Sequence, residues 1–176
     1  MANMEIVTVP SDTLRRKAIK IKKIDKSINK LINNMTETLR GLNGVGLAAP
    51  QVGESIKLII VESRGNKRKN GEEVPIIPLT ILINPEIIKT SKEKSCEDEG
   101  CFSVPGIWGS VERPTKITLK ALDRKGNQIK IRADGLFARA LQHEIDHLNG
   151  VLFTDKADIN TLHKIGPNGE KIKIEL

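Results

Sequence analysis

The stretch His143-Glu144-Ile145-Asp146-His147 carries the most information in this 176-residue chain and predicts a metal-bearing helix. Its two histidines stand four positions apart, so in a helix they lie on one face, one turn from each other. Both imidazoles can then reach a single metal ion. Glu144 directly follows the first histidine and is well placed to act on a water at the metal. The pattern is typical of a metal-dependent hydrolase.

The helix that carries this motif is predicted to run from about residue 135 to residue 148. Asp134 is a suitable N-cap, and Asn149-Gly150 provides the end of the helix. Leu136 and Ala140 share a stripe with the two histidines. The histidines therefore point the same way as the apolar face, towards the core.

The remaining elements are predicted from periodicity and turn signals. Apolar residues at helical spacing between Ile24 and Arg40 predict a helix near the N-terminus, ended by Gly41. Residues 43–51, NGVGLAAPQ, are small and predict no regular element, and residues 63–73 predict an exposed loop. Strands are predicted at 56–61 and at 80–84, the second ended by Pro85. A hairpin is predicted over 117–131, with its turn at 123–127.

Together these elements predict an α+β fold in a single domain over residues 1–176. Short, mostly antiparallel strands pack around the central metal-binding helix, and the N-terminal helix adds a further layer. The length is that of one domain with its own core. No apolar run approaches the roughly 18–20 residues of a membrane span, and the N-terminus shows no secretory signal.

Cysteine and charge content bear on location and partners. Cys96 and Cys101 are only five positions apart and would close a very small loop, so reduced thiols in the cytoplasm are expected. The net charge is +7, but the lysines are spread along the chain and aromatic residues make up only 2%. This argues against a dedicated nucleic-acid function and leaves a weak attraction to the RNA-rich ribosome open. A monomer is the default expectation.

The third metal ligand separates one class of metalloenzyme from another. The third histidine of the chain, His163, is expected on the surface. The metalloprotease pattern that continues His-x-x-Gly-x-x-His matches at Gly150 but has Phe153 where the ligand belongs. A downstream glutamate would have to be Glu170 or Glu175, in a tail interrupted by glycine and proline.

A cysteine thiolate is the remaining option for the third ligand. Cys101 lies in the turn-like segment 99–106, EGCFSVPG, where its sulfur could approach the helix. One thiolate and two imidazoles give three protein ligands and one open position, which is the catalytic arrangement.

Three segments resemble the peptide deformylases, in that family's order: 44–51 (GVGLAAPQ), 99–103 (EGCFS) and 142–147 (QHEIDH). The resemblance extends through 83–85, 104–106 and 111–114 and covers about residues 7–158. It implies removal of the formyl group from the N-terminal methionine of newly made proteins, with release of formate. It further implies one divalent ion, usually iron(II), which zinc, nickel or cobalt can replace, and N-formylmethionyl nascent peptides as substrates.

The resemblance also implies a role for each matching residue. Cys101, His143 and His147 would hold the metal. Glu144 would take a proton from water at the metal and pass it to the departing amine.

Further residues around the site have implied roles. The Gln51 amide and the backbone N–H of Phe102, a position where the family normally has leucine, would stabilise the oxyanion. Gly46 would expose its backbone to the substrate, and Val45 and Glu99 are assigned to substrate binding with it. For Glu99, orienting a histidine ligand is the alternative.

Two rival interpretations and an inactive relative stay open. A structural zinc module would use Cys96, Cys101, His143 and His147, which closes the site and leaves Glu144 without a role. The long separation between Cys101 and His143 disfavours it. A metallopeptidase would cut internal amide bonds instead.

Overall fold

The computed structural model describes residues 4–65 and 73–174. Its α-helices are α1 (Lys26–Leu42) and α2 (Gly135–Leu148). Its strands are β1 (Gly46–Ala48), β2 (Leu58–Arg64), β3 (Ile76–Thr90), β4 (Lys94–Cys101), β5 (Val104–Pro114), β6 (Lys116–Leu122), β7 (Gln128–Asp134), β8 (His163–Ile165) and β9 (Lys171–Lys173). Short 3₁₀ helices are η1 (Asp12–Arg15), η2 (Ala49–Val52), η3 (Phe153–Asp155) and η4 (Ile159–Thr161).

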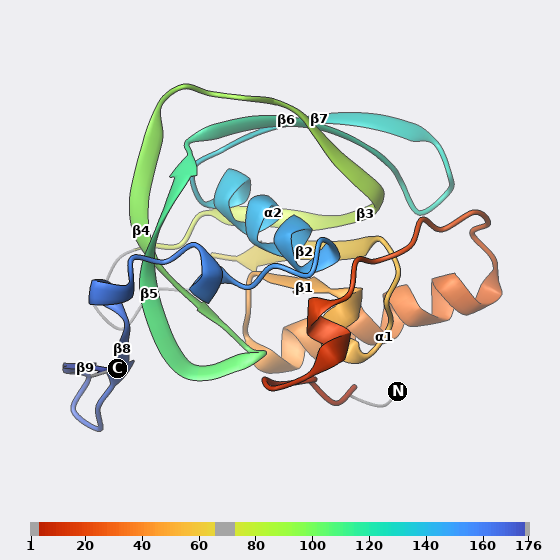
Figure 1. The fold of residues 1–176 in the computed structure, drawn as a ribbon. Helices are drawn as coiled ribbons and strands as arrows, with labels where there is room; N and C mark the ends of the chain where they lie inside the picture. The colour runs from red at the N-terminus through yellow and green to blue at the C-terminus, as the bar shows by residue number, and fades with distance from the viewer. Residues whose placement is uncertain (1–3, 66–72, 175–176) are drawn as a thin grey trace.

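The strands form two antiparallel sheets around α2. The five-stranded sheet has the order β1-β2-β3-β6-β7, and the four-stranded sheet has the order β4-β5-β8-β9. In Figure 1, α2 lies in the middle of the molecule, β6 and β7 pass above it, and β4 and β5 curve along one side. The predicted α+β class is confirmed, although β3 and β5 are longer than expected, at 15 and 11 residues. No helix in the described ranges is long and apolar enough to span a membrane.

Strand β2 explains why the predicted run 56–61 is apolar on both faces. Leu58 and Ile60 belong to the cluster that packs against α1, whereas Ile59 and Val61 belong to the cluster that packs against α2. All four side chains have no exposed surface. Successive strand residues point to opposite faces, so a helix on each side requires apolar residues at every position.

The predicted motif helix and hairpin are confirmed closely. Helix α2 has the predicted bounds, and Asn149 and Gly150 follow it, the latter with a φ of 74°. Asp134 occupies the N-cap position in an extended conformation, without a side-chain hydrogen bond to the helix. Strands β6 and β7 pair with Leu122 opposite Gln128, on either side of the predicted turn.

The end of α1 differs from the prediction. Gly41 lies inside the helix, and Asn43 forms the C-cap with a left-handed φ of 55°. Its N–H donates to the carbonyls of Leu39 and Arg40. Asparagine tolerates this backbone conformation better than most residues, so it replaces glycine as the terminating residue.

Strand β3 continues through Pro85, where its end was predicted. The pairing of β3 with β6 shifts register between Ile83 and Glu86, and Asn84 has a φ of 52°. This bulge leaves Pro85, which has no N–H, outside the ladder. The Asn84 side chain stabilises the bulge by bonding the backbone N–H and the carbonyl of Ile21, both at 2.9 Å.

Three further predictions need correction or fall partly outside the described residues. Residues 43–51 contain regular structure, namely β1 and most of η2. The predicted loop 63–73 begins within β2, and its residues 66–72 lie outside the described part of the chain. His163 is buried rather than on the surface, since it lies in β8 and pairs with Trp108 of β5.

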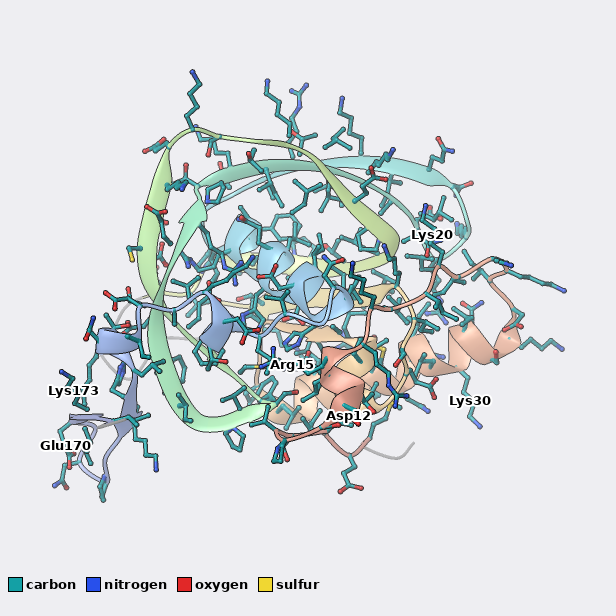
Figure 2. The ribbon with its side chains drawn as sticks, viewed as in Figure 1. Asp12, Arg15, Lys20, Lys30, Glu170 and Lys173 are labelled. Carbon is teal, nitrogen blue, oxygen red and sulfur yellow. The ribbon has the colours of Figure 1, made fainter. Side chains whose placement is uncertain are left out.

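The C-terminal segment forms a small hairpin of β8 and β9 at the edge of the four-stranded sheet. Figure 2 shows Glu170 and Lys173 in this hairpin, at the side of the molecule and apart from α2. Glu170 is exposed and bonds within its own turn, to the N–H of Asn168 at 3.0 Å. A glutamate ligand from the tail is therefore ruled out for Glu170.

Candidate metal centre

The structure brings together the three residues predicted to hold the metal. The ligand atoms of Cys101, His143 and His147 all lie within 4.8 Å of one another. Cys101 ends β4, and the two histidines lie one turn apart on α2, with ring centroids 5.1 Å apart. The Cys101 sulfur is 3.3 Å from Nε2 of His147.

Local structure explains why the cysteine sulfur reaches the helix. The pairing of β4 with β5 shifts register between Gly100 and Cys101, and Cys101 then pairs with Val104 across a two-residue turn. A register irregularity of this kind re-aims a side chain at the end of a strand. Helix α2 contributes its histidines through its i, i+4 spacing.

The donor set fits a divalent transition metal with an open coordination position. Nδ1 of His143 lies 2.9 Å from a carboxylate oxygen of Glu99, which leaves Nε2 of that ring to face the metal. Nε2 of His147 already faces the sulfur. A thiolate and two imidazoles suit iron, zinc, nickel or cobalt. Three protein ligands leave one position for water or substrate.

Glu144 lies beside this site in a buried position. Its side chain is 4% exposed, and its Oε2 has no hydrogen-bond partner among the described residues. Burial raises the pKa of Glu144 to about 7, above its ordinary value of 4.5. A buried carboxylate oxygen without a partner, titrating near neutral pH, is suited to accept a proton from a water molecule.

The two histidine ligands have opposite pKa shifts. Burial by itself lowers the pKa of His143, but the Cys101 sulfur and the carboxylates of Glu99 and Glu144 outweigh it and raise the pKa to about 10. These anionic neighbours favour a positive charge at this ring, and a divalent ion at Nε2 would supply it in place of the proton. Burial lowers the pKa of His147, and the positive charges of His143 and Arg113 lower it further. His147 is thus a neutral imidazole at pH 7, the form that binds a metal.

Glu99 is the centre of a buried ionic cluster behind His143. Arg113 donates to both of its oxygens, from Nε at 2.6 Å and from Nη2 at 2.8 Å, and Arg139 donates from Nη1 at 2.7 Å. Arg113 also bonds Asp146 at 2.8 Å. Burial by itself raises the pKa of Glu99, but Arg113 and His143 outweigh it and hold that pKa well below its usual range.

This cluster changes the interpretation of Glu99. Both carboxylate oxygens have partners and the residue is 6% exposed, which favours the alternative role, orientation of His143, over substrate binding. Arg113, Arg139 and Asp146 were not predicted as site residues. The signal for Asp146 was its position inside the HEIDH motif, and that for Arg113 was its place in the matching segment 111–114; Arg139 had none.

Gln51 lies within the site, in η2. Its side chain is 1% exposed, and its Oε1 accepts from the N–H of Ala48 at 2.8 Å. That bond fixes the amide so that Nε2 points to the Cys101 sulfur and to the Ser103 hydroxyl, each at 3.4 Å. Gln51 therefore presents an N–H donor next to the metal ligands.

The small residues before Gln51 have a steric reason. A Cβ built on Gly46 would lie 2.4 Å from a carboxylate oxygen of Glu144, so only glycine lets β1 approach α2 this closely. A Cβ on Gly44 would lie 2.4 Å from the ring of Phe102. Glycine at position 44 thus accommodates the phenylalanine that stands where the resemblance leads one to expect leucine.

Cys96 lies away from the site. It is exposed, with its sulfur 3.1 Å from the Ser110 hydroxyl. It is five residues from Cys101 in the same extended strand, a separation of roughly 16 Å at about 3.3 Å per residue. A four-ligand zinc module and a disulfide between the two cysteines are both incompatible with this geometry.

Comparisons with known proteins agree with the geometry of the site. Residues 3–163 match the family model for polypeptide deformylase. A peptide deformylase of Carboxydothermus hydrogenoformans is 49% identical over 158 residues, covering 90% of this chain and 95% of the relative.

Solved structures give the same result. The structure of peptide deformylase from Thermotoga maritima is 35% identical with a TM-score of 0.80, covering 90% of this chain and 99% of that one. A Met-Ala-Ser-bound class I type b peptide deformylase from Acinetobacter baumannii is 34% identical with a TM-score of 0.83, covering 88% and 98%. With a thiolate, two imidazoles and a buried carboxylate on the matching fold, this chain belongs to the polypeptide deformylase family.

Proposed function

We propose that this protein hydrolyses the formyl group from N-formylmethionyl peptides, using a divalent ion held by Cys101, His143 and His147. The observation that carries the proposal is the convergence of these three ligand atoms within 4.8 Å beside Glu144, whose Oε2 has no partner among the described residues. Family membership over most of the chain supports it.

The reaction requires a group that accepts a proton, a hydrogen-bond donor that stabilises the oxyanion, and a bound peptide. When bound, the divalent ion supplies Lewis acidity, which polarises the formyl carbonyl and makes a water more acidic. Glu144 takes a proton from that water as the water oxygen adds to the formyl carbon. Glu144 then gives the proton to the peptide nitrogen as the C–N bond breaks, which yields formate and a free amine.

Gln51 and Phe102 are proposed to stabilise the oxyanion. Nε2 of Gln51 lies 3.4 Å from the Cys101 sulfur, close to where the carbonyl oxygen must develop its charge. The backbone N–H of Phe102, the residue after Cys101, would be the second donor. Donors held rigidly at this place lower the barrier without reorganisation during the reaction.

Strand β1 is proposed to bind the peptide in an extended conformation. It lies at the end of the five-stranded sheet and pairs with β2 on one side. The other edge can take an added strand through main-chain hydrogen bonds, with Gly46 next to Glu144 and Val45 directly before the strand. The relative from Acinetobacter baumannii was solved with Met-Ala-Ser bound, a short peptide that begins with methionine.

The native metal is proposed to be iron(II), with zinc, nickel and cobalt as substitutes. Softer donors such as thiolate and imidazole suit all four ions. A thiolate ligand next to an open position also makes the site sensitive to oxidation. Metal analysis of protein purified without oxygen tests this assignment.

A cytoplasmic location, a monomeric state and a single domain over residues 1–176 stay predictions.

Formate release from a short formyl-methionyl peptide tests the proposed function. The protein is prepared without oxygen and loaded with iron or nickel, and the acetyl-methionyl peptide runs in parallel. Release from the formyl peptide alone, abolished by a chelator, is expected. Cleavage of internal amide bonds would favour a metallopeptidase, and a folded, metal-loaded protein that releases no formate would contradict the proposal.

A further inference from the structure

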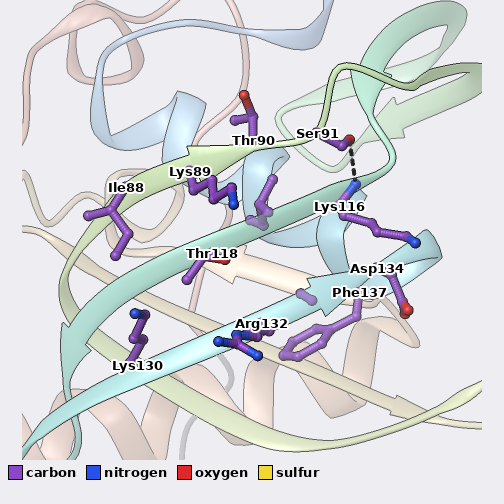
Figure 3. A pocket seen from close by; sticks show the side chains of 12 residues that line it. Ile88, Lys89, Thr90, Ser91, Lys116, Thr118, Lys130, Arg132, Asp134 and Phe137 are labelled. Carbon is purple, nitrogen blue, oxygen red and sulfur yellow. Dashed lines mark hydrogen bonds between the residues drawn. The ribbon is translucent and has the colours of Figure 1, made fainter.

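A basic cleft lies on the outer face of the five-stranded sheet, away from the metal centre. It has a volume of about 760 Å³ and is formed by β3, β6, β7 and the first turn of α2. Figure 3 shows Lys89, Lys116, Lys130 and Arg132 around it, with Asp134 at one end. Asp134 is the single acidic residue among those that line it.

The register of the sheet places these cations on one face. Lys89 of β3 lies opposite Thr118 of β6, which lies opposite Arg132 of β7. Residues directly opposite each other share a face, as do residues two apart in one strand. Lys116 and Lys130 therefore share this face. Lys130 and Arg132 are roughly 7 Å apart along β7, and Lys89 lies two strand spacings, roughly 10 Å, from Arg132.

These four cations are not neutralised by the protein. Among residues 4–65 and 73–174, none of their side chains makes an ion pair or hydrogen bond. The adjacent Lys120, by contrast, is paired with Glu86 at 3.3 Å. Asp134, directly opposite Lys116, is the one carboxylate on this face of the cleft and is not within ion-pair distance of it, so four cations face one acidic group. An anionic ligand would relieve the remaining repulsion.

The other groups in the cleft suit an unstacked nucleotide chain. Phe137, half-buried at the start of α2, packs against the core with part of its ring and also lines the cleft, and Ile88 adds an apolar surface that is 45% exposed. Thr118, on the same face as the cations, adds a hydroxyl that can bond ribose or phosphate oxygens. Unneutralised cations combined with an aromatic ring are typical of grooves that bind single-stranded nucleic acid.

We propose that this cleft binds single-stranded or looped RNA through its phosphates. The inference goes beyond the proposed function, because the cleft and the catalytic site lie at opposite ends of the sheet: β6 and β7 at one end, β1 at the other. Bound RNA would leave the free edge of β1 open to a peptide. The even spread of lysines along the sequence argued against such a site, but folding gathers lysines of three strands on one face.

Binding of a labelled 20-nucleotide uridine strand to the metal-loaded full chain tests the proposal. Fluorescence anisotropy at several salt concentrations gives the affinity and its salt dependence. Four phosphate contacts predict a slope of log K against log salt of roughly −3, at about −0.7 per phosphate. The variant K116E/K130E/R132E should lose at least about tenfold in affinity, with a shallower slope. F137L, which keeps an apolar side chain but removes the aromatic face, should bind several-fold more weakly.

A matched control variant separates the cleft from net charge. K20E/K22E/K30E makes the same change in charge at three exposed lysines, and Figure 2 shows Lys20 and Lys30 projecting from the N-terminal region. It should keep most of the affinity, and both variants should release formate from a short formyl peptide at the normal rate. Equal losses in the two charge variants, or tighter binding to anionic vesicles than to RNA, would overturn the proposal. Failure of formate release would bear on the proposed function alone.

Discussion

At the scale of single residues, the buried Gln51 side chain makes two kinds of contact: one fixes its orientation, and the other directs its N–H donor at the metal site. In Gln51, Oε1 is held by the N–H of Ala48 while Nε2 is directed at the Cys101 sulfur. The first contact fixes the amide, and the second places the donor next to the ligands. A residue of this kind serves catalysis only while its anchoring contact persists.

Substitution of Gln51 by leucine should lower turnover. Loss of an oxyanion donor typically raises the barrier by about 3 kcal/mol, which is more than 100-fold in kcat, with a smaller effect on KM. Steady-state kinetics on a formyl-methionyl peptide measure this. Ser103→Ala is the matched control, because it removes the other acceptor of the same amide nitrogen while keeping the donor. A normal kcat in Gln51→Leu would remove Gln51 from the proposed role.

The residues that the sequence predicted are those with a fixed spacing or a motif. The two histidines follow from i, i+4 spacing, and Glu144 follows from its place between them. Arg113 lies in the matching segment 111–114, but no role was implied for it there, and Arg139 has no signal. The two arginines come from different elements that meet at Glu99 only in the folded chain. A buried arginine cannot be distinguished in sequence from an exposed one.

At the scale of elements, the approach of β1 to α2 sets the position of Glu144. Gly46 has no Cβ, and one built there would meet Glu144 at 2.4 Å. Its φ is negative, unlike that of several other glycines in the chain, so alanine is acceptable to the backbone. The consequence of a substitution is therefore steric and falls on the catalytic carboxylate.

Gly46→Ala should reduce formate release while the protein stays folded and keeps its metal. The added methyl must displace Glu144 or push β1 away from α2, and a displacement near 1 Å can cost about 100-fold in rate. Activity and metal content measured on the same sample test this. Unchanged turnover would mean that Glu144 tolerates a shift or that β1 moves freely.

Cys96 and Cys101 lie far apart along β4, so their substitutions should have different effects on metal binding. Cys101→Ser should weaken metal binding substantially, because it exchanges a thiolate ligand for a poor one. Cys96→Ser should leave metal affinity and fold intact, since Cys96 is exposed and bonds only Ser110 among the described residues. Equilibrium metal titrations compare the two, and equal losses would restore the structural zinc interpretation.

Elements with local signals could be predicted, and those that depend on bulges could not. Helix α2 and the β6–β7 hairpin follow from periodicity, capping and turn residues. The sequence predicts that the strand at 80–84 ends at Pro85, because proline normally ends a strand. The bulge at Asn84, which lets β3 continue, depends on a contact with the distant Ile21. Gly41 and Asn43 both permit a left-handed C-cap, so the sequence does not determine that α1 ends at Asn43 rather than at Gly41.

At the scale of the whole molecule, the ionic cluster around Glu99 ties the four-stranded sheet to α2. It links β4 (Glu99), β5 (Arg113) and α2 (Arg139, Asp146), and its central side chains are 3–7% exposed. Removal of one charge from such a buried cluster leaves the others without compensation, which typically costs about 3–5 kcal/mol. The topology of two sheets around one helix was not predictable, because strand pairing between distant segments has no local signal.

Glu99→Gln should therefore destabilise the protein in a pH-dependent way. The folded pKa of Glu99 lies below its ordinary value of 4.5, so its contribution is full above that value and is lost as the pH falls towards the folded pKa. Urea unfolding at pH 7.5 should show a large loss relative to wild type, and the difference should narrow below about pH 4.5. Glu112→Gln, at an exposed pair with Lys94, is the control and should change little. A small loss at pH 7.5 would contradict the role of the cluster.

Formate release by metal-loaded Glu144→Gln, measured beside wild type with the metal content of both samples, tests the central claim most directly. Glutamine keeps the volume of the side chain against Gly46 but cannot take a proton from water. We predict full metal content and a rate lower by about 100- to 10,000-fold. A near-normal rate at full metal content would contradict the proposed mechanism, because proton transfer would then depend on another group.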